Sequence, residues 1–284
     1  MSAAVQLTSL DRVLYPHTGF TKGDLVDYYR AVAPVLVPHL AQRPLTLGRF
    51  PAGVEGRGFA QTECRGAPPW LATQPLRLRN GRIRNFCLVN DLPSLLWVAN
   101  LGTIELHPFL AHGTSPDEPT VLVFDLDPGP PAGLAECCDT ALALRELLAE
   151  SRLASFPKTS GGVGLHVYVP LNSPHTFEQT KQFARAIAER LAAERPEGVT
   201  AKPSKIDRAG KVFVDWVQND PTRSTVSAYS LRAASRPTVS APLSWEEVAG
   251  RQSLVVGPGD VVERIGRLGD LFAPVLEVRQ TLPR

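Results

Sequence analysis

Apolar residues recur along the chain with two different periods. Spacings of three and four residues, the period of an amphipathic helix, predict helices over 134–150 and 177–191 and a shorter one over 93–100. Thr21 to Asp24 reads as a capping box that opens another helix, which meets Pro34. Short apolar runs predict strands over 45–50, 103–108, 121–128, 164–171, 212–217 and 225–230. Because strands and helices mix without strict alternation, the pattern favours an α+β fold with helices packed on sheets.

Composition is that of an ordinary globular chain of 284 residues, 43% hydrophobic and 20% charged. The formal net charge is only +2, so the overall charge does not indicate a nucleic-acid binder. No apolar run approaches a membrane span, and residues 1–10 lack the regions of a signal peptide. The four cysteines lack the spacing of a zinc site, which fits a reducing cytoplasm.

One predicted strand, over 121–128, ends in two aspartates. Side chains alternate along a strand, so Asp125 and Asp127 project from the same face, and Pro128 and Gly129 end the strand. Neighbouring carboxylates repel unless a cation lies between them, and an all-oxygen pair suits Mg²⁺ or Mn²⁺. The alternative is an acidic strand-to-turn junction that caps a neighbouring helix.

A second acidic position, Asp215, interrupts the apolar and aromatic run over 211–217. A lone buried aspartate is costly unless it is paired or bound to a metal. Asp215 is therefore a candidate third ligand for the ion at Asp125 and Asp127. The alternative is a bond to Arg208 or Arg232.

A glycine-rich loop lies between these strands, over 158–168. Gly161, Gly162 and Gly164 free the backbone amides to approach an anion closely. Ser160 and His166 can donate to phosphate oxygens. The loop leads into a strand, so it is neither a Walker loop nor a Rossmann turn. The alternative is a tight turn with His166 on the surface of the strand.

A basic hairpin is predicted around Asn80-Gly81. With a two-residue turn, Arg79 faces Arg82 and Arg77 faces Arg84, so that all four arginines share one face. Four like charges on one face favour an anionic partner such as a nucleic-acid backbone. The alternative is a solvated surface hairpin.

Three function classes fit these features. In a two-metal nucleotidyltransferase, Asp125, Asp127 and Asp215 hold two cations. An aspartate-nucleophile phosphatase also has a strand that ends in Asp-x-Asp, but it expects Thr or Val where this chain has Gly129. The third class is a non-catalytic module that binds DNA ends or gaps.

The motifs together resemble the polymerase domain of bacterial ligase D, a primase-polymerase of non-homologous end joining in the archaeo-eukaryotic primase superfamily. The resemblance runs from 7–16 to about Trp245, through 67–71, 124–129, 159–166, 208–216 and 229–232. It implies a primase-polymerase fold with mixed or antiparallel sheets flanked by helices. A single domain over 1–284 is expected, with a DNA-binding portion at 1–115, a catalytic core at 116–250 and a C-terminal helical segment at 251–284.

The resemblance also implies site residues. The metal and catalytic positions are Asp125, Asp127 and Asp215, with His107 in the active centre. The nucleotide-binding positions are Ser160, Gly161, Gly162, His166 and Arg232. The DNA-binding positions are Arg12 and Lys22 at a downstream 5′-phosphate and Phe59 on a template base, to which the hairpin adds Arg77, Arg79, Arg82 and Arg84.

The implied activity is DNA repair synthesis at short gaps or broken ends, by end joining or excision repair. The enzyme would add nucleotides, with a preference for ribonucleotides, to primer 3′ ends with two Mn²⁺ or Mg²⁺ ions. The implied partners are gapped, overhanging or 5′-phosphorylated DNA, ribo- or deoxyribonucleoside triphosphates, a separate DNA ligase and a Ku-type end-binding protein, in the cytoplasm at the nucleoid. Relatives carry a lysine where Val163 stands, and a second aromatic residue and a lysine near Thr62.

Overall fold

The computed structural model describes residues 5–78, 80–204, 206–251 and 254–283. The chain forms two compact units. The first comprises residues 1–114, 224–240 and 256–270, and the second comprises residues 115–223, 241–255 and 271–284. Each unit is therefore assembled from three separate stretches of the chain. The first unit draws on all three portions that the sequence suggests, 1–115, 116–250 and 251–284.

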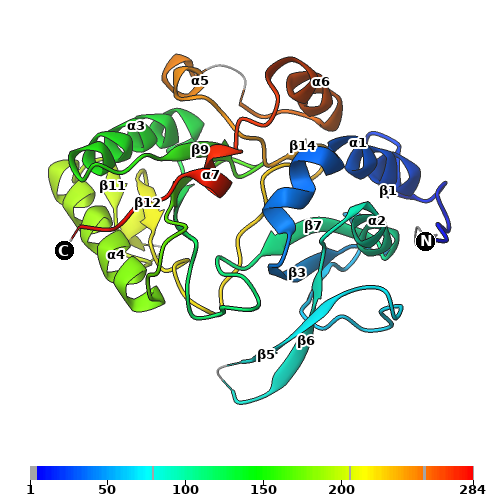
Figure 1. Ribbon diagram of the computed structural model, residues 1–284. Helices are drawn as coiled ribbons and strands as arrows, with labels where there is room; N and C mark the ends of the chain where they lie inside the picture. The colour runs from blue at the N-terminus through cyan, green and yellow to red at the C-terminus, as the bar shows by residue number, and fades with distance from the viewer. Residues whose placement is uncertain (1–4, 79, 205, 252–253, 284) are drawn as a thin grey trace. The chain divides into compact units, whose positions relative to one another are not determined.

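The first unit is built on a sheet in which β3 is the central strand (Figure 1). Strands β4 and β6 pair with successive parts of one edge of β3, β5 extends from β6, and β7 pairs with the other edge. Two further strand pairs, β1 with β2 and β13 with β14, complete the unit. The strands are β1 (Val13–Tyr15), β2 (Phe20–Thr21), β3 (Pro44–Arg49), β4 (Phe59–Gln61), β5 (Thr73–Arg77), β6 (Ile83–Leu88), β7 (Thr103–Pro108), β13 (Leu231–Ala233) and β14 (Pro237–Val239). The helices are α1 (Lys22–Leu40), α2 (Leu92–Asn100) and α6 (Pro258–Leu268).

The second unit is built on a five-stranded sheet with the order β11-β12-β8-β10-β9. All neighbours are antiparallel except β11 and β12. The strands are β8 (Val121–Pro128), β9 (Phe156–Thr159), β10 (Leu165–Pro170), β11 (Val199–Thr200) and β12 (Val212–Asp215). The helices are α3 (Leu134–Glu150), α4 (Phe177–Glu194), α5 (Trp245–Gly250), α7 (Pro274–Glu277) and the 3₁₀ turn η1 (Ile206–Arg208).

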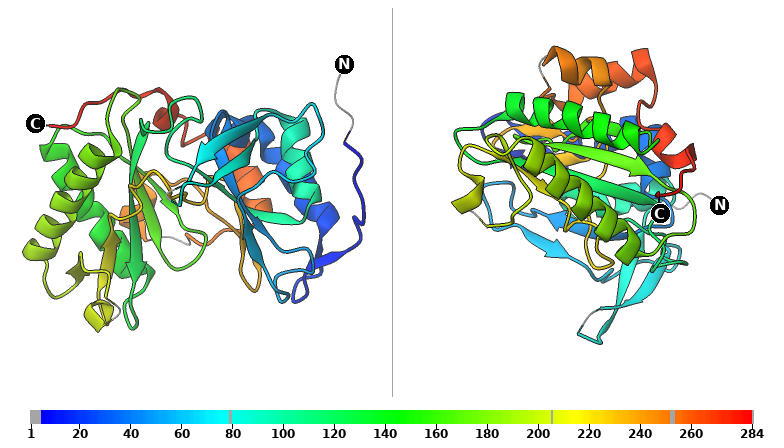
Figure 2. Two further views of the ribbon diagram at one scale, coloured as in Figure 1. Left: turned by 90° about the horizontal axis from the view of Figure 1, so that it is seen from below. Right: turned by 90° about the vertical axis from the view of Figure 1, so that its left-hand side faces the viewer.

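Helices α3 and α4 cover one face of this second sheet, as the right-hand view in Figure 2 shows. The core there contains Leu122, Phe124 and Leu126 of β8, which are fully buried at every second position. The residues between them face the other side of the sheet. The hydrophobic core therefore determines which side chains of β8 lie on the opposite face.

Beyond its pairing with β12, the edge of strand β8 is hydrogen-bonded by a side chain instead of by a neighbouring strand. The β12 ladder reaches only to Asp125 of β8. Beyond it, the Asn219 amide accepts from the Val123 N–H at 2.9 Å and donates to the Val123 carbonyl at 2.8 Å. Asn219 is fully buried, so it satisfies two backbone groups that water does not reach.

Most sequence-predicted elements are confirmed, but α1 is longer than the sequence suggests. The capping box at Thr21 and Asp24 is present, and the helix then continues past Pro34 and Pro38 to Leu40. Each proline removes one helical N–H donor. Both prolines are exposed, so water can satisfy the carbonyl that each one leaves without a helical partner.

The predicted strand over 225–230 is wrong. This stretch is buried but irregular, because Tyr229 has a φ of 64°, in the left-handed region that a regular strand does not use. Its backbone N–H groups hydrogen-bond to carbonyl groups of other segments without forming a regular strand. The Ser227 N–H donates to the Leu106 carbonyl at 2.8 Å, and the Tyr229 N–H donates to the Ser240 carbonyl at 2.8 Å.

Two of the cysteines form a disulfide that the sequence analysis did not anticipate. Cys64 and Cys87 are joined, with their Cα atoms 4.9 Å apart, while Cys137 and Cys138 are buried thiols. The pairing depends on the fold, because β6 carries Cys87 to the place where the Cys64 N–H donates to the Asn85 carbonyl.

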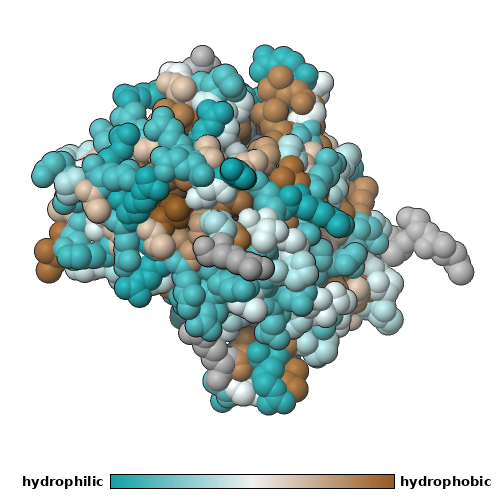
Figure 3. Space-filling model, turned by 60° about the vertical axis from the view of Figure 1, so that its left-hand side comes forward, coloured by the Kyte–Doolittle hydropathy of each residue, from teal (hydrophilic) through white to brown (hydrophobic). Residues whose placement is uncertain are grey.

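Among the described residues no helix is long and apolar enough to cross a membrane, and hydrophilic side chains dominate the face shown in Figure 3.

We expect Asn219→Ala to lower the free energy of unfolding by about 2 kcal/mol or more, because two buried groups of Val123 lose their partner. Urea unfolding followed by circular dichroism measures this loss. Gln182→Ala, at an exposed position of α4, should change the stability by less than about 0.5 kcal/mol. Equal stability of the two variants would contradict the role of Asn219.

Candidate active site

Four charged or polar side chains form a row across the sheet of the second unit. On β8, Asp125 lies directly opposite Asp215 of β12 and opposite His166 of β10. His166 in turn lies opposite Lys158 of β9. Directly opposed residues in a sheet share a face, and Asp127 shares it too because it follows Asp125 by two positions. The register therefore brings together three aspartates that the sequence separates by up to 90 positions.

His166 lies between an acid and a base in this row. Its Nε2 is 3.2 Å from Asp125 Oδ1, and its Nδ1 is 3.1 Å from the ammonium of Lys158. An ammonium group can only donate, so Nδ1 accepts and the proton of the neutral ring is on Nε2, the nitrogen nearer the Asp125 carboxylate. His166 is buried, so the alternative of a surface histidine is wrong.

Lys158 belongs to this row of side chains although no motif in the sequence marks it as a site residue. Its side chain is fully buried and its ammonium lies 5.5 Å from the centre of the Tyr168 ring. Lysine is almost never fully buried without a compensating partner. The only signal in the sequence is the strand-loop-strand arrangement over 156–170, whose register decides that Lys158 lies opposite His166.

Burial and neighbouring carboxylate charge raise the pKa values of two of the aspartates, Asp127 and Asp215. Burial and the charges of Asp125 and Asp215 raise the pKa of Asp127 to about 6, although Arg208 opposes the shift. Burial, with a contribution from Asp125, raises the pKa of Asp215 as well. The Arg208 guanidinium lies 3.9 Å from Asp127 and 3.8 Å from the centre of the Phe213 ring. The face thus carries negative charge that is incompletely compensated.

Asp215 is held in place by polar groups. Its carboxylate accepts from the Val217 N–H at 2.9 Å and from the Gln218 side chain at 3.1 Å. The alternative of an Arg208 partner is not realised, because that side chain pairs with Asp127. Nor do the strand-end aspartates cap α3, whose first turn is closed by Glu136 on the Gly133 N–H.

The chemistry of this donor set fits a divalent cation. Carboxylate oxygens are the ligands that Mg²⁺ and Mn²⁺ prefer, and a cation would remove the repulsion that raises the pKa of Asp127. In the described part of the chain, no three His, Cys, Asp or Glu side chains are already gathered as a metal site. The face on which an ion would bind carries Asp125, Asp127 and Asp215. To coordinate one ion together, their carboxylate groups would have to turn toward it.

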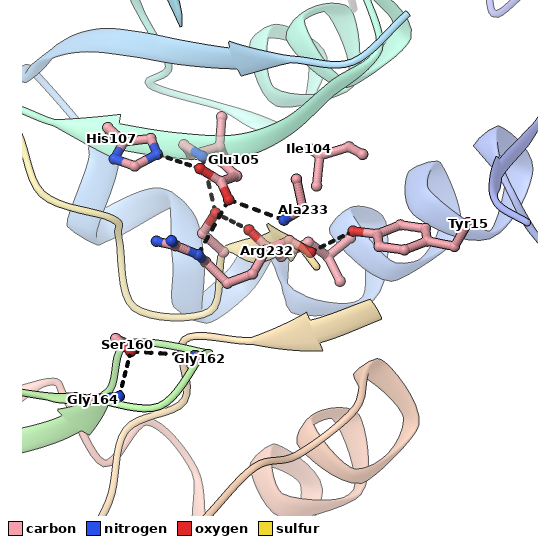
Figure 4. Close-up of polar contacts among 12 residues, drawn as sticks. Tyr15, Ile104, Glu105, His107, Ser160, Gly162, Gly164, Arg232 and Ala233 are labelled. Atoms are coloured by element: carbon pink, nitrogen blue, oxygen red, sulfur yellow. Dashed lines mark hydrogen bonds and ion pairs between the residues drawn. The ribbon is translucent and has the colours of Figure 1, made fainter. Parts of the chain in front are cut away.

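The glycine-rich loop of the second unit is folded around Ser160. The Ser160 hydroxyl accepts from the N–H groups of Gly162 and Gly164, both at 3.2 Å (Figure 4). Gly161 has a φ of 77°, and a Cβ on Gly164 would lie 2.4 Å from the Leu126 carbonyl oxygen, so both positions require glycine. A phosphate at this loop would replace the bonds that Ser160 now accepts.

A second polar cluster lies within the first unit (Figure 4). Glu105 and His107, on β7, are joined by a 2.9 Å contact between Glu105 Oε2 and His107 Nε2. The Nε of Arg232, on β13, lies 3.2 Å from Glu105 Oε1. His107 and Arg232 are site residues expected from the sequence, and the structure adds the carboxylate between them.

The DNA-binding candidates Arg12 and Lys22 both lie in the first unit. The Lys22 ammonium donates to the Thr8 carbonyl at 2.6 Å, and Arg12 donates to the Pro51 carbonyl at 2.8 Å. Burial and the nearby charge of Arg12 lower the pKa of Lys22. The two cations therefore repel each other.

The aromatic candidate Phe59 lies on β4 and is 46% exposed. The Arg49 guanidinium lies 5.3 Å from the centre of its ring. Arg49 also donates to Gln61 at 2.6 Å and to the Leu101 carbonyl at 2.7 Å, so its plane is fixed. Phe59 therefore presents part of its ring to solvent while Arg49 lies against it.

The predicted face of four arginines is wrong. Strand register places Arg77 opposite Ile83 and Leu76 opposite Arg84, one residue away from the predicted register. The hairpin closes with a Leu78 N–H bond to the Arg82 carbonyl, so its loop has three residues. Arg82 and Arg84 thus share a face with Leu76, opposite to the face of Arg77. The fourth arginine, Arg79, lies outside the described residues.

Comparison with known proteins identifies relatives over nearly the whole chain. The family described as LigD, primase-polymerase domain, matches residues 21–272. The chain is 41% identical over 277 residues to the multifunctional non-homologous end joining protein LigD of Mycobacterium bovis, an alignment that covers 94% of this chain and 36% of that protein. It is 30% identical over 271 residues to the bifunctional LigD of Bacillus subtilis, covering 94% of this chain and 43% of that protein. The chain thus spans less than half the length of either relative.

One solved structure matches the fold throughout. It is the polymerase domain from Mycobacterium tuberculosis ligase D in complex with DNA, with a TM-score of 0.91 and 39% identity over 98% of this chain and 99% of that chain. The expected α+β primase-polymerase fold is therefore confirmed. By sequence and by structure, the chain belongs to the LigD primase-polymerase domain family, a family of nucleotidyltransferases.

Proposed function

We propose that this chain is a DNA repair polymerase that adds nucleotides to primer 3′ ends at short gaps or broken ends. The observation that carries the proposal is the placement of Asp125, Asp127 and Asp215 on one face of a sheet, with the pKa of Asp127 raised to about 6. Such a face attracts cations, and nucleotidyl transfer is catalysed largely by positioning and charge stabilisation.

We assign the three aspartates as the ligands of two Mg²⁺ or Mn²⁺ ions. When bound, the ions would lower the pKa of the primer 3′-hydroxyl and neutralise charge on the triphosphate. Gln218 and the Val217 N–H orient Asp215 for this role. The Nε2–H of His166, whose position on the ring is set by Lys158, would donate to a phosphate oxygen.

The remaining site residues are assigned to substrates. Ser160, Gly161 and Gly162 would bind the triphosphate through the loop, and His107 and Arg232 are likewise assigned to nucleotide binding. Arg12 and Lys22 would bind a 5′-phosphate on the downstream strand, and Phe59 would stack on a template base. Arg77, Arg82 and Arg84 would contact the DNA backbone from both faces of the hairpin instead of one.

The cellular setting is also part of the proposal. The named relatives are non-homologous end joining proteins, and the matched polymerase domain was solved with DNA. We infer a ribonucleotide preference and a place at the nucleoid in the cytoplasm. A DNA ligase and a Ku-type protein would act with this chain. The competing function is a non-catalytic module that binds gapped DNA, which the three carboxylates on one face of the sheet disfavour.

Primer extension on a gapped duplex tests the assignment. We expect Asp127→Asn to reduce extension by on the order of 100-fold or more, because the ion loses a charged ligand, with little effect on DNA binding. Asp117→Asn, at an exposed position of the same unit, is the matched control and should extend normally. Retained synthesis in Asp127→Asn would refute the metal assignment, and tight binding of gapped DNA without any synthesis by the unaltered chain would favour the binding module.

Metal binding should also change stability in a pH-dependent way. The pKa of Asp127 is about 6 in the folded protein against an ordinary 3.8, so the folded state binds more protons between these values. Stability of the metal-free protein should therefore fall as pH rises from about 4 to about 6. Thermal melting should show a larger gain from Mn²⁺ at about pH 7 than at about pH 5. Asp127→Asn should diminish both effects, and a pH-independent gain would argue against an ion at this carboxylate.

A lysine at position 163 should strengthen nucleotide binding. Val163 is 70% exposed at the tip of the glycine loop, so an added ammonium there can reach a bound triphosphate without disturbing the core. We expect Val163→Lys to lower the Michaelis constant for the nucleotide by up to about five-fold, the range of an exposed ion pair. Val163→Gln supplies a polar side chain without the charge, only one atom shorter than lysine, and should leave the constant unchanged. An equal effect of both substitutions would exclude a charge effect.

A further inference from the structure

Glu105 is the shared partner of two side chains that the proposed function assigns to nucleotide binding. Its carboxylate is 15% exposed and lies on β7, two residues from His107 on the same face of the strand. A Cβ on Gly48 of the neighbouring strand would lie 2.8 Å from the Cβ of Glu105. Glycine at position 48 therefore makes room for the Glu105 side chain.

Both oxygens of this carboxylate are used (Figure 4). Oε2 lies 2.9 Å from His107 Nε2. Oε1 accepts from the Ala233 N–H at 3.0 Å and lies 3.2 Å from Arg232 Nε. Burial alone would raise the pKa of Glu105, but the His107 hydrogen bond and the Arg232 charge outweigh it, so its pKa is lowered and the group is ionised at neutral pH.

An ionised carboxylate can only accept, which fixes the protonation pattern of its partners. His107 must carry its proton on Nε2, so in the neutral ring Nδ1 is an acceptor. Arg232 uses its Nε toward Glu105, and the described residues supply no hydrogen-bond partner for its terminal Nη1 and Nη2 groups. The guanidinium thus keeps its two NH₂ groups, whose four N–H donors suit an anionic ligand.

Buried tyrosines hydrogen-bond to the backbone next to Glu105 on β7 and to the backbone around Arg232 on β13. The Tyr15 hydroxyl donates to the Arg232 carbonyl at 2.7 Å. The Tyr29 hydroxyl donates to the Ile104 carbonyl at 2.6 Å and accepts from the Leu231 N–H at 3.3 Å. With the main chain held in this way, the carboxylate is the link that decides how the His107 and Arg232 side chains point.

We propose that Glu105 is a positioning residue that orients His107 and Arg232 together for the incoming nucleotide. The inference rests on the proposed function, since it takes these two side chains as nucleotide ligands. Glu105 acts through them and does not itself contact the nucleotide. Its removal should therefore weaken nucleotide binding and leave the maximal rate less affected.

The substitution Glu105→Gln removes the negative charge but keeps the size of the side chain, and its amide oxygen can still accept from the Ala233 N–H. We expect the Michaelis constant for the nucleotide to rise about ten-fold or more, with a smaller change in kcat. The matched control is Glu55→Gln, which alters a glutamate that also pairs with a histidine, His17, but on the surface at 3.4 Å. This control should extend primers normally.

A second readout does not depend on activity. In ¹⁵N-labelled protein, the two-bond imidazole correlations of His107 should show a proton on Nε2, and Glu105→Gln should shift the ring toward a mixture of tautomers. His17 supplies the reference signal, which should not change. An unchanged His107 spectrum together with an unchanged Michaelis constant would overturn the proposal.

A double-mutant cycle completes the test. Arg232→Lys should also raise the Michaelis constant, and adding Glu105→Gln should raise it little further if the two groups act as a unit. Multiplicative effects would refute the coupling.

If the unaltered chain neither binds nor incorporates nucleotides, the proposed function fails, whereas normal incorporation by Glu105→Gln contradicts only the role of Glu105. If Glu105→Gln does not fold, the His107 tautomer of the unaltered chain and the effect of Glu105→Asp on the Michaelis constant still decide the question.

Discussion

The antiparallel register of β8 with β10 and β12 is the constraint on which the site of the second unit depends. Leu122, Phe124 and Leu126 are buried against helices on one face, so the aspartates must lie on the other. A slip of one residue would exchange the two sets and place two carboxylates in the hydrophobic core. The free energy of core burial therefore also fixes the position of the charged groups, although none of them contributes to that core.

Charge is distributed unevenly along the row that this register creates. At one end Lys158 is fully buried beside His166. At the acidic end, formed by Asp215 and Asp125, the adjacent Asp127 on the same face is half-exposed. Burial of Lys158 is costly unless a partner accepts from its ammonium, and His166 is one such acceptor. The exposed end keeps its excess negative charge, where a hydrated cation can reach it. The row is thus rigid at its buried end and open at the end where an ion would bind.

The sequence predicts elements best where the pattern is long and local. The helix over 134–150 and the strand over 103–108 are found with the predicted bounds. The predictions are wrong where one backbone angle decides whether a strand forms, or where one loop residue decides the register of a hairpin. The φ of Tyr229 breaks the strand over 225–230, and one additional loop residue separates Arg77 from Arg84. Neither feature is visible in hydrophobic periodicity, because both depend on turn geometry and tertiary contacts.

The same limit applies to the polar groups that support the candidate site. Asp125 and Asp127 are recognisable because they are neighbours in sequence, whereas Glu105 meets Arg232 across 127 positions and Tyr15 reaches the same residue across 217. A glutamate in a predicted strand has no local property that marks it as a shared partner. Its role follows from two strands, β7 and β13, being held at hydrogen-bonding distance by buried hydroxyl groups. Residues that touch a ligand are therefore easier to find in a sequence than the residues that orient them, since only the folded chain brings the latter to their partners.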